Sequence, residues 1–128
     1  MTNIRLIEEK DNAIMKNIIQ SILRDHGLAI AGTAYFDESL NNLSQHYRVN
    51  KPSNYYVVQV EGSIVGGGGY GPYDLEKKIT ELQKIYIETT DKLEKANLVY
   101  LKWGFQALES PLKAGEHYAM NRFFIKDL

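Results

Sequence analysis

The feature that most constrains this chain is a predicted strand that runs directly into a predicted helix, over residues 80–105. Its first half is rich in β-branched and aromatic residues, which is typical of a strand. Thr90 or Asp91 can then cap a helix, and Asp91 with Glu94 three residues later matches a capping box. Gly104 ends the helix, because glycine adopts the left-handed cap conformation at little cost. The rest of the chain has to be arranged around this unit.

Two helices are predicted before it, after a short candidate strand at residues 3–8. Asp11 or Asn12 can cap the first helix, and Gly27 is a natural stop. Its apolar residues fall on one face at helical spacing: Ile14, Met15, Ile18, Ile19, Ile22 and Leu23. Asp37 opens the second helix, whose apolar stripe consists of Phe36, Leu40, Leu43 and Tyr47. His26, in the last turn of the first helix, is interpreted as a surface residue.

A hairpin is the clearest strand prediction, with residues 55–60 and 63–66 on either side of a Glu61-Gly62 turn. The glycine run at 66–69 could be mistaken for a phosphate-binding loop. Such a loop leads from a strand into a helix N-terminus, whereas Pro72 follows here without a Lys-Ser/Thr pair. The run therefore predicts a bulge or a close backbone approach.

After the helix that ends at Gly104, residues 105–108 and 117–125 are predicted as two strands joined by a connector at 109–116. The sequence contains no repeat, linker or low-complexity stretch. We therefore expect a single α+β domain over residues 1–128.

Composition excludes several classes of protein. The 128 residues include no cysteine, so a disulfide, a thiolate zinc site and a cysteine nucleophile are impossible, and no metal site is predicted. Fifteen basic and sixteen acidic side chains give a formal charge of −1, which argues against a nucleic-acid partner. No apolar run approaches the roughly 18 residues needed to span a bilayer, and the first residues lack the layout of a signal peptide. The expectation is a cytoplasmic protein with no membrane partner.

Several local motifs resemble the GNAT superfamily of N-acetyltransferases. Residues 61–71 resemble the family's second and third strands, and Glu-Leu-Gln-Lys-Ile-Tyr-Ile at 81–87 resembles its fourth strand. Residues 87–90 resemble the end of the fifth strand. Ala96-Asn-Leu-Val-Tyr-Leu-Lys-Trp-Gly-Phe105 is similar to the family's A-x-x-x-Y-x-K-x-G-F helix ending, and residues 111–117 resemble a late loop. The order of the predicted elements also resembles the GNAT fold.

This resemblance implies transfer of acetyl from acetyl-CoA to an amine in a cleft where the fourth and fifth strands splay apart. By resemblance Glu81 would be the general base and Tyr100 the general acid that protonates the leaving thiolate. The ordinary alternatives are a solvated surface carboxylate for Glu81 and a core tyrosine for Tyr100.

The resemblance also implies binding residues. Backbone groups of Ile85, Tyr86 and Ile87 would pair with the pantetheine arm of the cofactor, and Asn97 would touch the cofactor. His117 would help to bind the substrate, or would be a structural or exposed residue. The acceptor is a small-molecule or peptide amine that the resemblance does not identify.

One family motif is missing: no R/Q-x-x-G-x-G/A loop lies between Glu81 and Phe105. In the family this loop binds the pyrophosphate at a helix N-terminus. Two parallel strands need a crossover of a dozen or more residues, usually a helix, and only about one strand's length is available here. A deletion between two similar Lys-Ile-Tyr-Ile stretches, natural or engineered, would produce such a join, as would a sequence from which a segment had been left out.

The predicted fold is therefore a GNAT-like central sheet, mostly antiparallel and flanked by helices, which lacks the central crossover helix and about one strand. The fused strand at 80–90 would pair on both sides, acetyl-CoA binding would be weakened, and one apolar sheet face would be uncovered. Such a face favours a homodimer. The alternative to an active enzyme is a catalytically silent GNAT remnant that acts as a binding or dimerising module.

Overall fold

The computed structural model describes residues 1–72, 84–112 and 117–127. The chain divides into two compact units, Met1–Ala29 with Tyr35–Tyr73, and Ile30–Ala34 with Asp74–Leu128. The expectation of one domain over residues 1–128 stays a prediction. The α+β class and the antiparallel pairing are confirmed, because all four strand pairs of the described residues are antiparallel.

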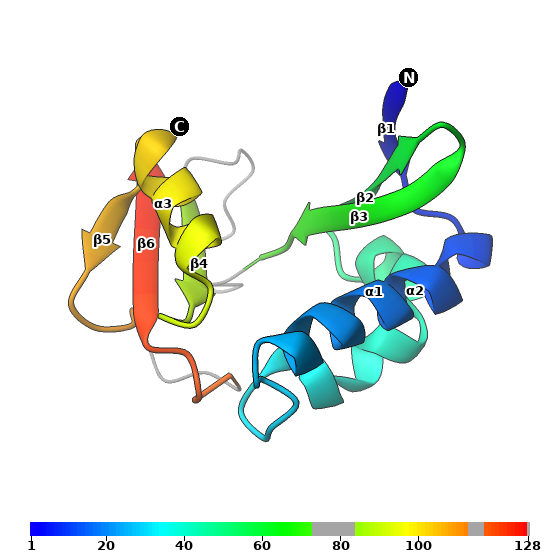
Figure 1. The fold of residues 1–128 in the computed structure, drawn as a ribbon. Coiled ribbons are helices and arrows are strands. Elements are labelled where there is room, and N and C mark those ends of the chain that lie inside the picture. Colours follow the sequence, from blue (N-terminus) through cyan, green and yellow to red (C-terminus); the bar gives the residue numbers. More distant parts are fainter. Residues whose placement is uncertain (73–83, 113–116, 128) are drawn as a thin grey trace. The chain divides into compact units, whose positions relative to one another are not determined.

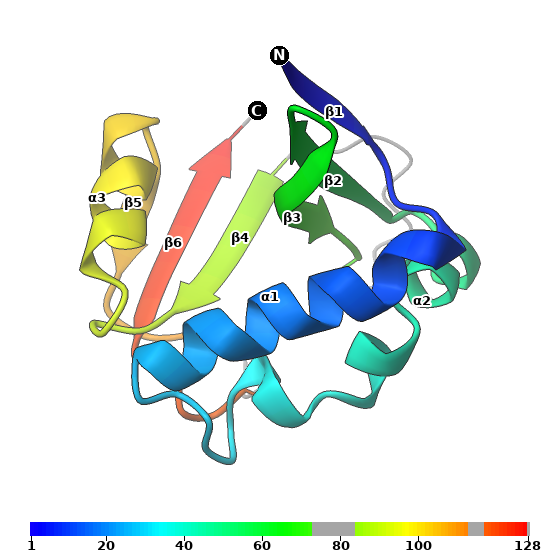
Figure 2. The same cartoon turned by 45° about the vertical axis from the view of Figure 1, so that its right-hand side comes forward.

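The first unit is a three-stranded sheet with two α-helices on one of its faces (Figure 1; Figure 2). The strand order is β1-β2-β3, and each strand is antiparallel to its neighbour. The elements are β1 Thr2–Leu6, α1 Asn12–Asp25, α2 Leu43–Val49, β2 Asn54–Val60 and β3 Ser63–Tyr70, with short 3-10 turns η1 Glu9–Asp11, η2 Ala34–Phe36 and η3 Glu38–Asn41. The predicted first strand, first helix and hairpin are confirmed.

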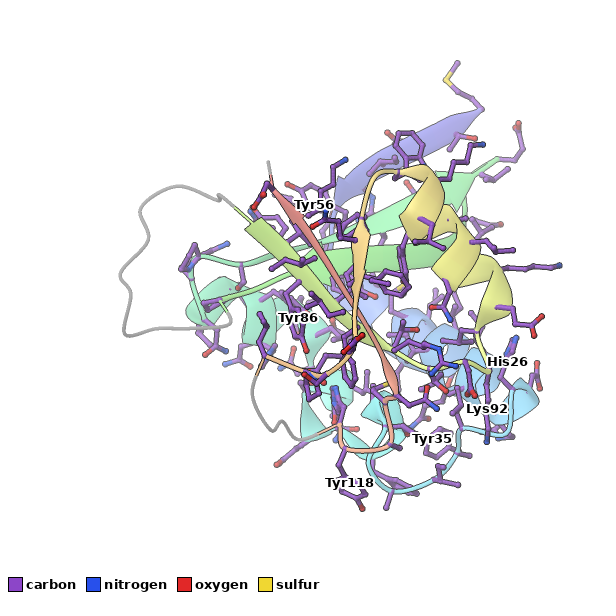
Figure 3. The ribbon with its side chains drawn as sticks, turned by 90° about the vertical axis from the view of Figure 1, so that its left-hand side faces the viewer. His26, Tyr35, Tyr56, Tyr86, Lys92 and Tyr118 are labelled. Atoms are coloured by element: carbon purple, nitrogen blue, oxygen red, sulfur yellow. The ribbon has the colours of Figure 1, made fainter. Side chains whose placement is uncertain are left out.

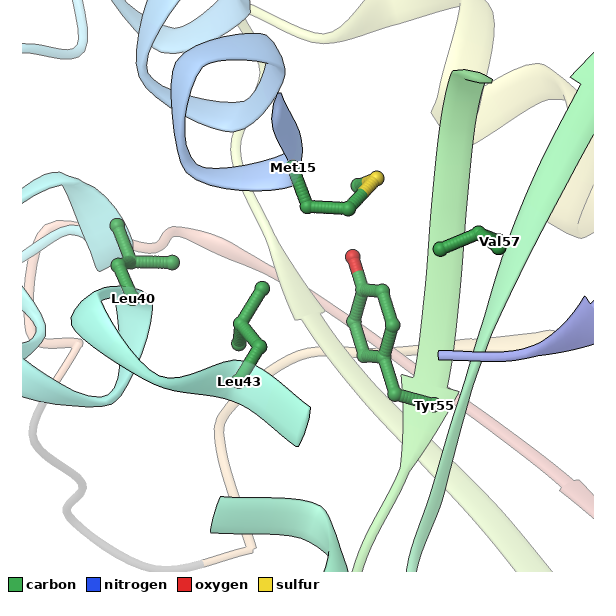
Figure 4. Close-up of a cluster of buried hydrophobic side chains, with 5 residues drawn as sticks. All are labelled: Met15, Leu40, Leu43, Tyr55 and Val57. Carbon is green, nitrogen blue, oxygen red and sulfur yellow. The ribbon is translucent and has the colours of Figure 1, made fainter. Parts of the chain in front are cut away.

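The core of this unit lies between the helices and the sheet, as Figure 4 shows. It is formed by Met15, Leu40, Leu43, Tyr55 and Val57. Burial of such side chains is worth about 1.5 to 3 kcal/mol each before entropy is counted.

The other face of the sheet is exposed. Side chains alternate between the two faces along a strand, and residues opposite one another in a ladder point to the same face. The β1 and β2 side chains that do not point to the core therefore lie together on this exposed face. The exposed apolar side chains that β1 and β2 place on this face are Ile4, Leu6, Tyr56 and Val60.

Asp11 precedes α1, as predicted, but its side chain does not cap the helix. Its two carboxylate oxygens accept hydrogen bonds from the Arg5 guanidinium at 2.7 and 2.9 Å, and one of them also accepts from the Glu8 backbone N–H at 2.8 Å. The Arg5 side chain, with these bonds, lowers the pKa of the buried Asp11 carboxyl. This ion pair joins β1 to the start of α1.

The single helix predicted from Asp37 is wrong. The chain forms η3 and then α2, with Asn42 between them at φ −154° and ψ 66°. The Asn42 side chain accepts from the Gln45 backbone N–H and from Asn12 Nδ2, so it caps a new helix instead of continuing the old one. Leu40 and Leu43 are buried as predicted, whereas Phe36 is exposed.

The glycine run of β3 confirms the predicted close approach. A Cβ on Gly67 would lie 2.8 Å from the Tyr55 ring and 2.9 Å from the Met15 methyl group, and one on Gly69 would lie 2.6 Å from the same ring. Gly66 and Gly68 point the other way and have no such neighbour within 4 Å. The register also shifts beside Val58, which is the predicted bulge. The alternate glycines therefore leave room for the Tyr55 ring.

The second unit contains β4 Lys84–Thr89, α3 Glu94–Lys102, β5 Gln106–Leu108 and β6 Arg122–Asp127, in the sheet order β4-β6-β5. Residues 80–83 of the predicted fused strand lie outside the described residues, and β4 pairs with β6 along one edge. The last strand starts at Arg122, not at residue 117 as predicted. The Ala119 backbone N–H donates to Gly32 O at 2.9 Å and so holds the preceding residues in a turn outside the sheet.

Replacing Gly67 by alanine should lower the free energy of unfolding by about 1 to 3 kcal/mol, because the new methyl group overlaps the Tyr55 ring and the Tyr56 carbonyl. Gly68→Ala is the matched control and should change stability by no more than about 0.5 kcal/mol. Urea titration followed by circular dichroism measures both. Equal losses for the two variants would contradict the packing described here.

Replacing Asp11 by asparagine should destabilise the first unit by about 2 to 4 kcal/mol at neutral pH, because the Arg5 charge loses its buried partner. Since folding lowers the Asp11 pKa, the wild-type contribution is present above the unfolded value of about 4 and is lost as pH falls through the folded value. Urea unfolding from pH 3 to 7 should show that the variant loses less stability on acidification. Glu38→Gln, at an exposed carboxylate, is the control and should show the acid dependence of wild type. If Asp11→Asn also showed the wild-type acid dependence, this role for Asp11 would be contradicted.

Candidate active site

The strand-to-helix junction at 89–94 is held by several hydrogen bonds. Thr89 and Thr90 are buried, and Thr90 O accepts from the Leu93 backbone N–H at 3.1 Å. Asn97 Nδ2 donates to the same carbonyl at 2.9 Å. One donor from the residue before α3 and one from its first turn thus fix the end of β4 against the helix.

The predicted capping box at Asp91 and Glu94 is wrong. The helix begins only at Glu94, after Leu93, and no side-chain cap bond is made. The Asp91 backbone N–H donates instead to Asn121 Oδ1 at 2.9 Å, in the segment before β6. Asn121 and then Thr90 lower the pKa of the Asp91 carboxyl by hydrogen bonding, which outweighs desolvation.

Tyr100 lies near the end of α3 and packs against two aromatic rings. Its ring centroid is 5.6 Å from that of the buried Phe124 and 5.9 Å from that of Phe105. Gly104, at φ 89°, reverses the chain so that the Phe105 backbone N–H reaches Tyr100 O at 3.0 Å. Burial raises the pKa of the half-buried Tyr100 hydroxyl above its ordinary value.

The three predicted pantetheine-binding residues lie on β4. Ile85, Tyr86 and Ile87 stand opposite Lys126, Ile125 and Phe124 of β6. The Tyr86 hydroxyl, labelled in Figure 3, accepts from the Leu112 backbone N–H at 3.3 Å. The strand then passes to α3 through four residues, with no other helix in between.

Within residues 1–72, 84–112 and 117–127, Asn97 has one polar atom without a partner. Its amide nitrogen bonds Thr90 O, whereas its buried Oδ1 and the buried Thr89 Oγ1 have no hydrogen-bond partner in these ranges. Buried polar atoms of this kind are uncommon in folded proteins and call for an explanation such as a ligand, a water or local strain.

His117 lies in a turn that contacts the segment after α1. Its carbonyl accepts from the Met120 backbone N–H at 3.0 Å, and Ala119 N–H bonds Gly32 O. The Tyr118 ring, also labelled in Figure 3, lies over Gly32, where a Cβ would come within 2.6 Å of it. Residues 30–34 and the turn at 117–121 therefore form one surface of the second unit.

The described residues hold no group of three or more His, Cys, Asp or Glu side chains placed to bind a metal. No helix in the described part of the chain is long and apolar enough to cross a membrane.

The chain is similar to acetyltransferases both in sequence and in structure, although no family model matches it. It is 38% identical over 85 residues to the uncharacterized N-acetyltransferase YjgM of Escherichia coli K12, a match over 64% of this chain and 50% of that protein. A GNAT-family acetyltransferase structure from Staphylococcus aureus Mu50 superposes with a TM-score of 0.75 at 17% identity, over 99% of both chains. The chain has the GNAT fold.

A second similar structure is RimJ of Mycobacterium smegmatis in complex with CoA-disulfide, with a TM-score of 0.59, 12% identity, and coverage of 98% of this chain and 81% of that one. The resemblance of the sequence to GNAT N-acetyltransferases is thus confirmed. The sequence match spans about half the length of the E. coli protein.

The structure brings some of the predicted GNAT site residues into one unit. Tyr100 and Asn97 lie on α3, and residues 85–87 lie on the strand that leads into it. Glu81, the predicted base, lies outside the described residues, so no distance joins it to Tyr100. Its role and those of the other site residues stay predictions.

Sequence reasoning missed three contributors to this site. Asn121 joins the junction to the segment before β6, because its backbone N–H donates to Thr89 O at 2.9 Å and its Oδ1 accepts from Asp91 N–H. Phe124 packs against the Tyr100 ring. Phe124 was placed in a predicted strand, but its contact with Tyr100 depends on the β4-β6 register, which periodicity alone does not give.

Replacing Thr89 by valine should raise the free energy of unfolding by about 1 kcal/mol, because it removes a buried hydroxyl that no described residue bonds and keeps the shape of the side chain. Thr33→Val is the matched control in the same unit. Thr33 Oγ1 donates to Ile30 O at 2.8 Å, so this variant should lose about 1 kcal/mol. Thermal unfolding measures both, and a destabilised Thr89→Val would contradict the description of Thr89.

Proposed function

We propose that this chain is an acetyl-CoA-dependent N-acetyltransferase that acts on a small-molecule or peptide amine. The observation that carries the proposal is the environment of Tyr100. The half-buried tyrosine lies at the end of α3 with its ring beside Phe105 and Phe124, and a tyrosine hydroxyl carries its proton at neutral pH. A general acid must carry its proton when the leaving group departs. The N-acetyltransferase name of the E. coli relative supports the reaction type.

In the proposed reaction the amine nitrogen attacks the carbonyl carbon of the thioester. A C–N bond forms, the C–S bond breaks, and the electron pair of that bond leaves with sulfur. Tyr100 gives its proton to the CoA thiolate, and Glu81 takes the proton that the amine loses. Residues 85–87 pair through their backbone with the pantetheine arm. Asn97 Oδ1, which has no partner in the described part of the chain, accepts from a cofactor N–H.

Cofactor binding should be weak. In the continuous segment 84–112, β4 leads to α3 without the helix that binds the pyrophosphate in the family. Loss of such a helix N-terminus removes backbone donors and a favourable dipole, each worth roughly 0.3 to 1 kcal/mol or more. Several such terms lower the affinity by more than a factor of ten, since each 1.4 kcal/mol is tenfold.

The acceptor amine would enter beside His117. This residue lies in the turn that residues 30–34 hold in place through Gly32. We propose that His117 contacts the amine substrate, that the protein works in the cytoplasm, and that it forms a homodimer.

A second candidate function is a catalytically silent GNAT module that binds or dimerises. Two observations favour it: the missing crossover helix in segment 84–112, and the exposed apolar face of the first sheet. Both are expected of a protein that keeps the GNAT fold but has lost catalytic activity.

Acetyl-CoA at about 1 mM should raise the melting temperature, because a ligand selective for the native state stabilises it by mass action. Tyr100→Phe should leave the melting temperature nearly unchanged and lower the turnover of an amine panel about 100-fold, the lower range for loss of a general acid. Tyr56→Phe, at a partly exposed tyrosine of the first unit, is the matched control and should keep wild-type turnover.

Absence of any shift with acetyl-CoA would exclude the enzyme and leave the silent module. A shift with unchanged turnover in Tyr100→Phe would instead remove Tyr100 from its proposed role and keep the enzyme.

A further inference from the structure

The first unit contains a pocket that plays no part in the proposed acetyl transfer. It has a volume of about 370 Å³ and lies where the end of β1, η1, α2 and the start of β2 meet. This is the lower end of the range for small-molecule sites, which runs from roughly 300 to 1,000 Å³. The lining residues are Leu6, Ile7, Glu8, Glu9, Ser44, Tyr47, Arg48, Lys51, Asn54 and Tyr55.

Its apolar wall is built by strand ends and aromatic rings. Ile7, the residue after β1, lies on this wall, and its backbone N–H bonds Tyr55 O at 2.9 Å. The Tyr47 and Tyr55 rings lie 5.1 Å apart, centroid to centroid, at an angle of 55°. Burial raises the pKa of both hydroxyls, that of Tyr55 to about 12, so this wall is uncharged at neutral pH.

Two cationic side chains of the pocket, Lys51 and Arg48, have N–H donors that are not used within the described residues. Lys51 Nζ donates to Ser53 O at 2.7 Å and to Asn54 Oδ1 at 2.9 Å, so its position is fixed by neutral oxygens. A lysine ammonium has three donors, which leaves one for a ligand. Among the described residues, Arg48 makes no hydrogen bond or ion pair, so all five of its donors are available.

The acidic lining residues do not cancel these cations. The Glu8 carboxylate pairs with Arg5 at 3.5 Å and with Lys10 at 3.0 Å, both outside the pocket lining. Glu9 alone remains to offset Arg48 and Lys51, which leaves one positive charge. One positive charge, free N–H donors and an apolar wall together match a small monocarboxylate with an apolar or aromatic body.

We infer that this pocket is a binding site for such a carboxylate, with Arg48 and Lys51 as the carboxylate ligands and Tyr47 and Tyr55 as the surface against which the apolar body packs. The inference does not rest on acetyl transfer, because every lining residue belongs to the first unit.

The test is a titration of the ¹⁵N-labelled full chain with 3-phenylpropionate, followed by NMR chemical shifts. Saturable shifts should gather on residues of the pocket lining with a dissociation constant of about 1 mM or below. The uncharged analogue 3-phenylpropionamide should bind about tenfold more weakly, because it lacks the charge-assisted bonds.

Arg48→Gln should weaken 3-phenylpropionate binding about tenfold with no loss of fold, since Arg48 has no partner among the described residues to lose. Lys95→Gln makes the same change of charge on α3, outside the pocket, and should bind like wild type. Shifts that do not saturate, equal binding of acid and amide, or equal binding by Arg48→Gln and wild type would each overturn the inference.

Discussion

The structure depends on the direct passage from β4 to α3. Parallel neighbours in a sheet require a crossover of a dozen or more residues, and only four residues separate this strand from its helix. The strand therefore pairs antiparallel with β6, which returns from the far end of the chain. That pairing places Phe124 beside Tyr100 and sets the environment on which the proposed chemistry relies.

Each unit is held by contacts that differ in kind. The first unit has a conventional core, in which alternate glycines of β3 make room for Tyr55, and an Arg5–Asp11 pair that ties the first strand to the first helix. The second unit relies more on hydrogen bonds around Thr90 and on three aromatic rings. A fold of this kind can lose a crossover helix because neither sheet needs a parallel strand.

Much of the fold could be predicted because its signals are local. The Glu61-Gly62 turn, with both residues at positive φ, and the stop at Gly104 follow from glycine's conformational freedom and from turn chemistry. The errors came from distant partners. Asn42 bonds Asn12, and the predicted second helix is interrupted there. The Asp91 N–H bonds Asn121, and the predicted capping box at Asp91 does not form. Ala119 bonds Gly32, and the last strand begins later than predicted. The candidate site was predicted from motif resemblance, and its packing was not predictable from spacing.

The most direct test of this account is the pattern of cross-strand NOEs in the native protein. An antiparallel ladder between β4 and β6 places Tyr86 opposite Ile125, with Ile85 opposite Lys126 and Ile87 opposite Phe124. The account predicts backbone NOEs that connect these pairs in opposite chain directions. NOEs that run in the same chain direction, or no contacts between the two strands, would contradict it.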